Sequence, residues 1–121
     1  MNTYKYIISL CAVFMLISVS MASANGLSAG TYQLVDGQLP FTLNVMQNPD
    51  GKFFLVGNGA TADGRNCRVG DLAELRGGQL LIGSCSAGIS TAADGFKLND
   101  ANNCFQCVPG LSASGVYKRS N

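Results

Sequence analysis

The sequence contains no histidine, so it lacks the side chain that most often acts as a general base near neutral pH. No Ser–His or Cys–His pair can form, and no imidazole is present to bind a metal ion. Paired carboxylates can hydrolyse glycosides, but they must lie on either side of a cleft. Asp71 and Glu74 are the only closely spaced acids, and a solvated face or turn accounts for them without catalysis. We therefore expect that the protein is not an enzyme and uses no cofactor.

An excess of charge of one sign is also missing from the 97 residues that follow residue 24. These residues include seven bases and seven acids, which are interspersed and give no net charge. A nucleic-acid partner is therefore not expected, because such binding relies on a basic surface that neutralises phosphates. No metal site is expected either, since the chain has neither a D-x-D-x-D-G run nor paired Cys-x-x-Cys motifs.

Long hydrophobic runs are absent after residue 24, but one precedes it. A lysine comes before an apolar run from Ile7 to Val19, and Ala22-Ser23-Ala24 provides small residues at a cleavage position. This order is typical of a secretory signal peptide, and the run is shorter than the ~20 residues that a membrane-spanning helix needs. We predict that residues 1–24 form a cleavable signal helix. Residues 25–121 are expected to form a single exported domain, periplasmic or extracellular, with no membrane segment.

Turn-forming dipeptides recur through residues 25–121. Asp-Gly and Gly-Gly pairs are strong signals for β-hairpin turns, because their residues tolerate positive φ. They occur at 36–37, 50–51, 63–64, 77–78 and 94–95. The segments between them, such as Phe41–Met46 and Gly95–Asn99, alternate apolar and polar residues, which is typical of strands with one buried face. Asp71–Arg76 contains helix-forming residues and could form a single helical turn, but glycines on both sides prevent a longer helix.

These signals predict an all-β domain of about eight antiparallel strands arranged as a meander. A Gly-x-Tyr pattern occurs near both ends of the predicted domain, at Gly30–Tyr32 and Gly115–Tyr117. Pairing of the first and last strands would remove both exposed edges. We therefore favour a small closed barrel over a two-sheet sandwich, and we expect both tyrosines to be core or rim residues.

Four cysteines remain after residue 24, and an even number indicates disulfides in a small exported chain. They are Cys67, Cys85, Cys104 and Cys107. Cys67 and Cys85 flank the predicted turn at 77–78, which favours a Cys67–Cys85 bond together with a Cys104–Cys107 bond. The spacing leaves both crossed pairings open.

The Cys-Phe-Gln-Cys motif at 104–107 is the stretch that most suggests reactive chemistry. A redox-active motif of this kind usually sits at a helix N-terminus, where the helix dipole lowers the thiol pKa. Here turn-forming residues precede the motif, and Pro109 discourages a helix after it. We therefore interpret the motif as a structural staple, with thiol–disulfide exchange through Cys104 and Cys107 as an alternative.

Three segments of the chain are arranged along the sequence as in known families of small exported proteins. They are the opening Ala29–Leu34, the late Ala93–Leu98 and the closing Ser114–Tyr117. In an exported chain of this size, they resemble small periplasmic β-barrel inhibitors, the lysozyme and metalloprotease inhibitors of Gram-negative bacteria. The chain departs from the first family by one residue fewer between the closing Gly and Tyr, and from the second by having no tryptophan. The resemblance implies a barrel fold and a protein partner, but it transfers no inhibitory residue.

We therefore expect an exported, non-catalytic binding protein, and the resemblance implies inhibition of a secreted or periplasmic hydrolase. Rigid scaffolds present binding residues on loops, so loop and terminal residues are the candidate contacts. They are Phe105, Gln106, Lys118 and Arg119, with a cap over the barrel end as a second interpretation of Phe105. A structural or assembly protein is an alternative, in which an open edge strand pairs with another copy.

Overall fold

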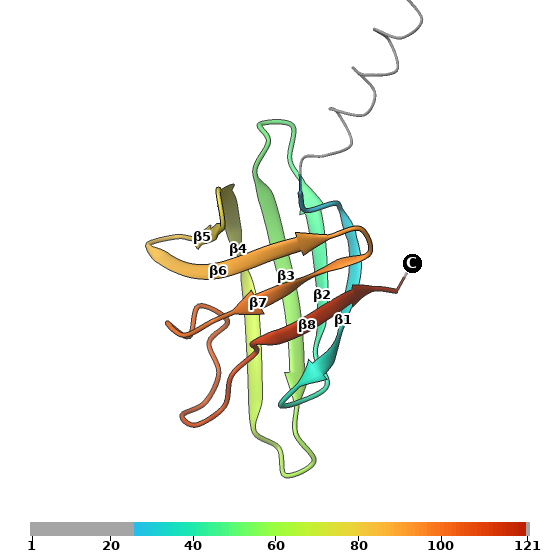
Figure 1. The fold of residues 1–121 in the computed structure, drawn as a ribbon. Coiled ribbons are helices and arrows are strands. Elements are labelled where there is room, and N and C mark those ends of the chain that lie inside the picture. The colour runs from blue at the N-terminus through green and yellow to red at the C-terminus, as the bar shows by residue number, and fades with distance from the viewer. Residues whose placement is uncertain (1–25, 121) are drawn as a thin grey trace, which may run out of the picture.

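Alternation of apolar and polar residues produces eight antiparallel strands in the computed structural model, which describes residues 26–120. Consecutive strands are neighbours around a closed barrel, so the meander and the closure are both confirmed, and a two-sheet sandwich is not formed (Figure 1). The strands are β1 (Gly30–Gly37), β2 (Thr42–Gln47), β3 (Phe53–Ala60), β4 (Asn66–Arg76), β5 (Gln79–Ile82), β6 (Cys85–Ala92), β7 (Gly95–Asn99) and β8 (Gly115–Arg119). The predicted signal peptide, residues 1–24, lies outside the described residues.

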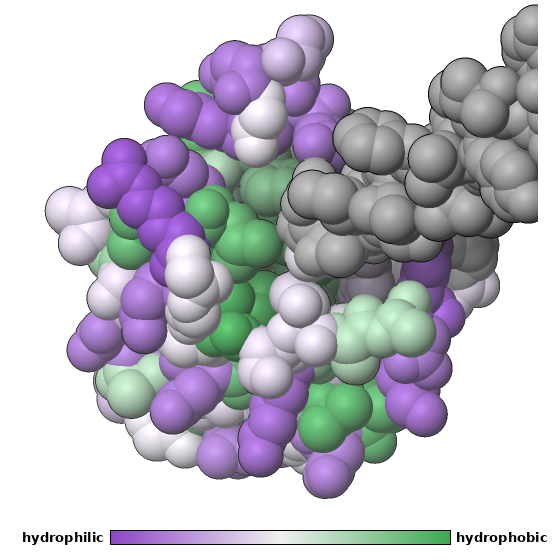
Figure 2. All heavy atoms as spheres, turned by 45° about the horizontal axis from the view of Figure 1, so that its top comes forward, coloured by the Kyte–Doolittle hydropathy of each residue, from purple (hydrophilic) through white to green (hydrophobic). Residues whose placement is uncertain are grey.

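The core fills the inside of the barrel, because every second side chain of each strand points inward. On β2, Leu43 and Val45 are buried while Met46 is exposed. Aromatic rings meet in the middle of this core, where the ring centroid of Phe96 lies 4.8 Å from that of Tyr117. Figure 2, in which the top of Figure 1 is tilted toward the reader, shows apolar residues in the middle and polar residues around them. Among residues 26–120, no helix is long and apolar enough to span a membrane.

Four of the five predicted turns lie at or overlap hairpin turns, at 50–51, 63–64, 77–78 and 94–95. The fifth prediction was wrong. Asp36 and Gly37 are the last residues of β1, where they pair with Val116 and Gly115 of β8, and the chain turns after them. The expectation of a helical turn at Asp71–Arg76 was also wrong. This segment belongs to β4, because it pairs with β3 on one side and with β5 on the other.

Strands β1 and β8 close the barrel through the two segments that carry the Gly-x-Tyr pattern. Leu34 of β1 pairs with Tyr117 of β8, and Gly37 pairs with Gly115. Gly115 has a φ of 146°, and a Cβ atom at this position would lie 2.0 Å from the carbonyl oxygen of Asp36. Only glycine therefore allows the two strands to approach so closely here.

Both tyrosines of the pattern are buried, as predicted, and both make the same hydrogen bond. The hydroxyl of Tyr32 donates to the backbone carbonyl of Ser28 at 2.7 Å, and that of Tyr117 donates to the carbonyl of Ala113 at 2.6 Å. Each bond reaches a carbonyl four residues earlier in the chain. A buried phenol needs such a partner, and each end of the domain supplies one locally.

Tyr117 should make the protein sensitive to alkali. Burial raises the pKa of its hydroxyl, and the negative charge of Asp100 raises it further. The unfolded chain loses this proton at about pH 10, whereas the folded protein keeps it. The contribution of Tyr117 to stability is thus complete below about pH 10 and is lost as the pH rises further. We expect the free energy of unfolding, measured in urea from neutral to strongly alkaline pH, to fall less steeply above this pH in Tyr117→Phe than in the wild type.

The Tyr32→Phe variant is the matched control, because it loses the same kind of hydrogen bond from the tyrosine near the start of the described chain. It should be less stable than the wild type at neutral pH. An equal flattening of the alkaline slope in Tyr32→Phe would contradict the assignment of this effect to Tyr117.

Candidate functional site

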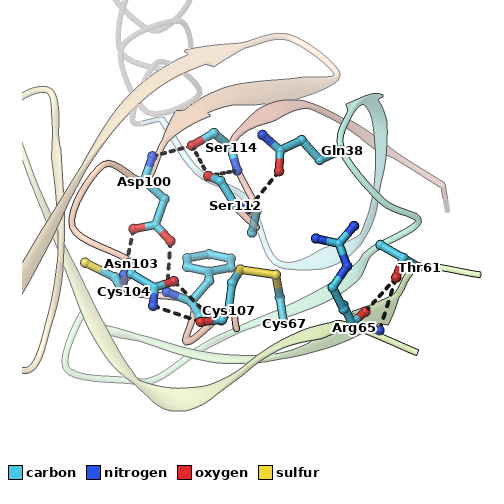
Figure 3. Close-up of a disulfide and its surroundings, with 12 residues drawn as sticks. Gln38, Thr61, Arg65, Cys67, Asp100, Asn103, Cys104, Cys107, Ser112 and Ser114 are labelled. Carbon is cyan, nitrogen blue, oxygen red and sulfur yellow. Dashed lines mark hydrogen bonds between the residues drawn. A yellow bond between two sulfur atoms is a disulfide. The ribbon is translucent and has the colours of Figure 1, made fainter. Parts of the chain in front are cut away.

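Two disulfides lie at one end of the barrel, and their pairing differs from the predicted one. Cys67 is bonded to Cys107, and Cys85 is bonded to Cys104. The prediction of Cys67–Cys85 with Cys104–Cys107 was therefore wrong, and one of the crossed pairings is formed. Figure 3 shows the Cys67–Cys107 bond and its surroundings.

The cause of this difference is a tight turn that the sequence interpretation missed. β5 ends at Ile82, and the chain reverses at Gly83 and Ser84, so that Ile82 pairs with Cys85 at the start of β6. Cys85 is thereby carried away from β4 and cannot reach Cys67. The Gly83-Ser84 dipeptide is itself a turn signal, with Gly83 at a φ of 62°, and it would have separated the two cysteines.

The Cys-Phe-Gln-Cys motif is structural, but in a form that the sequence did not predict. Its two cysteines are not bonded to each other. Cys107 is tied to the start of β4 and Cys104 to the start of β6, and both cysteines of the motif are buried. The motif therefore bridges two strands that are not neighbours in the barrel, in the long connection between β7 and β8.

A buried carboxylate holds this connection in place. Asp100 directly follows β7, is 3% exposed, and is the only buried charged residue in the described part of the chain. Its two carboxylate oxygens accept hydrogen bonds from the backbone N–H groups of Cys104 at 2.7 Å and Phe105 at 2.9 Å. Its own N–H donates to the Ser114 hydroxyl at 2.7 Å (Figure 3). Backbone dipoles thus stabilise the buried charge and fix the shape of the loop.

Of the predicted contacts, Phe105 is not available to a partner. Its side chain is fully buried, and its ring centroid lies 5.8 Å from that of Phe41 in the core. Its carbonyl accepts a hydrogen bond from the N–H of Arg68 on β4 at 3.0 Å. Phe105 thus anchors the loop in the core, in keeping with its interpretation as a cap and not as a contact.

Gln106 is displayed at the surface between the two disulfide-bonded cysteines. It is exposed, whereas the preceding Phe105 is buried, and it has a positive φ of 44°. An open groove of about 280 Å³ lies on the neighbouring β3–β4 hairpin, lined by Asn58, Asn66 and Arg68 among others. The sequence analysis did not single out these residues, although polar residues on both sides of the Asp63-Gly64 turn are a usable signal. We call Gln106, Asn58 and Asn66 the disulfide-end surface.

Lys118 and Arg119 lie at the opposite end of the barrel. The backbone N–H of Arg119 donates to the carbonyl of Asp94 in the β6–β7 turn, and Lys118 pairs with Gly95. The structure thus places the two basic candidates far from Gln106, so the four predicted contacts do not form one site. The C-terminal end of β8 lies beside the β6–β7 turn, whereas the loop that carries Gln106 lies beside the start of β4.

No group of three or more His, Cys, Asp and Glu side chains within residues 26–120 is arranged to hold a metal ion. Asp71 and Glu74 each have a local partner: Asp71 accepts a hydrogen bond from the N–H of Leu72, and Glu74 forms an ion pair with Arg76. No known protein family, curated protein or solved structure matches the chain.

Proposed function

We propose that this is an exported, non-catalytic binding protein that holds a partner protein at its disulfide-end surface. The observation that carries the proposal is the fixed shape of the connection between β7 and β8. Two disulfides, the buried Asp100 carboxylate and the buried Phe105 ring hold a segment that has no regular secondary structure. A loop fixed in this way loses little conformational entropy on binding, so that more of the contact energy appears as affinity.

Export is supported by the two disulfides, since such bonds form and persist in oxidising compartments. The predicted signal peptide in residues 1–24 points the same way. We infer that the protein acts in the periplasm or outside the cell.

We infer further that the partner is a secreted or periplasmic hydrolase that the protein inhibits. The resemblance to small periplasmic β-barrel inhibitors supports this choice, as does the display of an uncharged polar side chain, Gln106, on a rigid tip. An amide both donates and accepts hydrogen bonds, so it can pair with polar groups that line a hydrolase cleft. The core of the barrel is filled by its own side chains, so binding at the outer surface is favoured over an internal ligand.

The two alternative functions have less support. Assembly by strand pairing needs an open edge, and among β1 to β8 both end strands are paired with each other. Thiol–disulfide exchange through Cys104 and Cys107 needs an accessible motif that closes on itself, whereas these two cysteines are buried and bonded to different strands.

The proposal is tested by measuring inhibition of a panel of secreted glycoside hydrolases and metalloproteases by the oxidised protein. We expect inhibition of one of them, and a loss of at least about tenfold in affinity in Gln106→Arg, because this change adds bulk and charge at the tip. Gln106→Arg should unfold at the wild-type temperature, since the side chain is exposed.

Lys118→Glu at the opposite end is the matched control and should inhibit like the wild type. The proposal fails if the wild type inhibits no hydrolase and captures none from culture medium or periplasmic extract. It also fails if Lys118→Glu weakens inhibition as much as Gln106→Arg does.

A further inference from the structure

A row of exposed apolar side chains crosses the outer face of β2, β3 and β4. Four large hydrophobic residues are exposed among residues 26–120, and three of them lie here: Met46 (47%), Val56 (39%) and Leu72 (49%). The register places Met46 opposite Phe54, and Phe54 opposite Leu72, so that these side chains adjoin across three strands. Val56 is the next outward residue of β3. We call Met46, Phe54, Val56 and Leu72 the apolar row.

Charged side chains border the apolar row on β4 at both of its sides. The outward residues of β4 are, in order, Asn66, Arg68, Gly70, Leu72, Glu74 and Arg76, and the last two form an ion pair. Arg68 lies toward the disulfide end of the barrel, and Glu74 lies toward the other end. Gly70 leaves an open space on this face, because a Cβ atom at its position would meet no atom within 4 Å.

We propose that the apolar row is the interface of a homodimer in which two barrels stack face to face with antiparallel strands. The twofold axis lies in the interface plane, perpendicular to the strands, at the level of Asp71. This axis places Leu72 over the partner's Gly70, so that a large side chain meets an open space. It places Arg68 over the partner's Glu74, so that opposite charges meet twice. The face is thus complementary to itself, as a twofold interface between identical chains requires.

The same twofold rotation also brings apolar side chains of β3 together. This strand lies beside β4 in the middle of the face (Figure 1). Because Leu55 pairs with Asp71, the axis passes Leu55 and places Phe54 over the partner's Val56. Two apolar side chains therefore meet at each of these positions. Stacked sheets pack about 10 Å apart, a separation that such side chains fill.

The side chains that would face one another favour the antiparallel orientation. A parallel stacking would place Arg68 over the partner's Arg68 and Leu72 over the partner's Leu72. Like charges would then repel each other, and the space above Gly70 would stay unfilled. Glu74 already pairs with Arg76 of its own chain at 3.2 Å, and its second oxygen can accept from the partner's Arg68. The balanced charge of residues 25–121 removes general repulsion between copies.

The test is the mass of the oxidised protein in solution, measured by sedimentation equilibrium from micromolar to millimolar concentration. We expect a monomer–dimer equilibrium in the wild type and a monomer in Leu72→Asp. Val35→Asp is the matched control, because Val35 is 56% exposed but lies on β1, outside the apolar row. This control should dimerise like the wild type, and circular dichroism should show that both variants are folded.

A charge exchange tests the orientation. Arg68→Glu and Glu74→Arg should each weaken the dimer by at least about tenfold, and the double variant should regain most of the loss. A wild type that is monomeric at every concentration overturns the proposal. A double variant that dimerises no more tightly than the single variants also overturns it. The outcome is separable from the proposed inhibition, because Gln106→Arg lies outside the apolar row and should leave the dimer intact.

Discussion

Replacement of Cys67 and Cys107 by alanine should lower the free energy of unfolding by about 4 kcal/mol. The bond joins residues 40 positions apart, so it restricts a large part of the unfolded chain, and the loop-closure entropy grows with loop length. The Cys85–Cys104 bond closes a shorter loop, with a separation of 19 residues, and its removal should cost about 3 kcal/mol. Alanine is the replacement of choice because a serine hydroxyl would be buried at the fully buried position 67.

Urea unfolding of the two double-alanine variants and the wild type at one pH measures both losses. Proteolysis without reduction, followed by mass spectrometry of the linked peptides, establishes the pairing independently. A peptide pair that links Cys67 to Cys85 would contradict the pairing from which the expected order of the two losses follows.

Phe105→Ala should destabilise the protein by about 3–5 kcal/mol, the range for truncation of a buried aromatic side chain. Its ring is fully buried against Phe41, and it joins the connection between β7 and β8 to the core. The loss is a large share of the total stability of a small domain, which is about 5–15 kcal/mol. Thermal and urea unfolding measure this loss directly.

Gln106→Ala is the neighbouring control, and it should change the stability by no more than about 0.5 kcal/mol because the side chain is exposed. If Phe105→Ala unfolded like the wild type and yet bound its partner more weakly, Phe105 would be a contact and not an anchor.

The strands were predictable because their signals are local. Alternation and paired turn residues predicted Gly95–Asn99 with the observed bounds, and the Gly-x-Tyr segments indicated the strands that close the barrel. Propensity failed at Asp71–Arg76, where pairing with two neighbouring strands overrides the helix-forming tendency of single residues.

The disulfide pairing and the binding surface were harder to predict, because both depend on which end of the barrel each residue reaches. The position of Cys85 depends on β5, a strand of only four residues, and on the turn that follows it. Because the sequence analysis overlooked this turn, it predicted the wrong disulfide pairing. Gln106 was found from its place between two cysteines, but Asn58 and Asn66 belong to a different hairpin, which only the closed barrel brings beside this loop. The burial of Phe105 depends on the same tertiary packing, which the alternation of apolar and polar residues within one segment cannot predict.

The pairing of β1 with β8 also sets the order of events when the protein is made. Ser120 and Thr31 are hydrogen-bonded although they are 89 residues apart, so the seam of the barrel cannot form until almost all of the described chain has been synthesised. Before that moment β1 is an open edge that can pair with other unfinished chains, and contacts so distant in sequence make folding slow. Cys67 likewise has to wait for Cys107. Folding and oxidation are therefore late events, completed only when β8 is available to pair with β1.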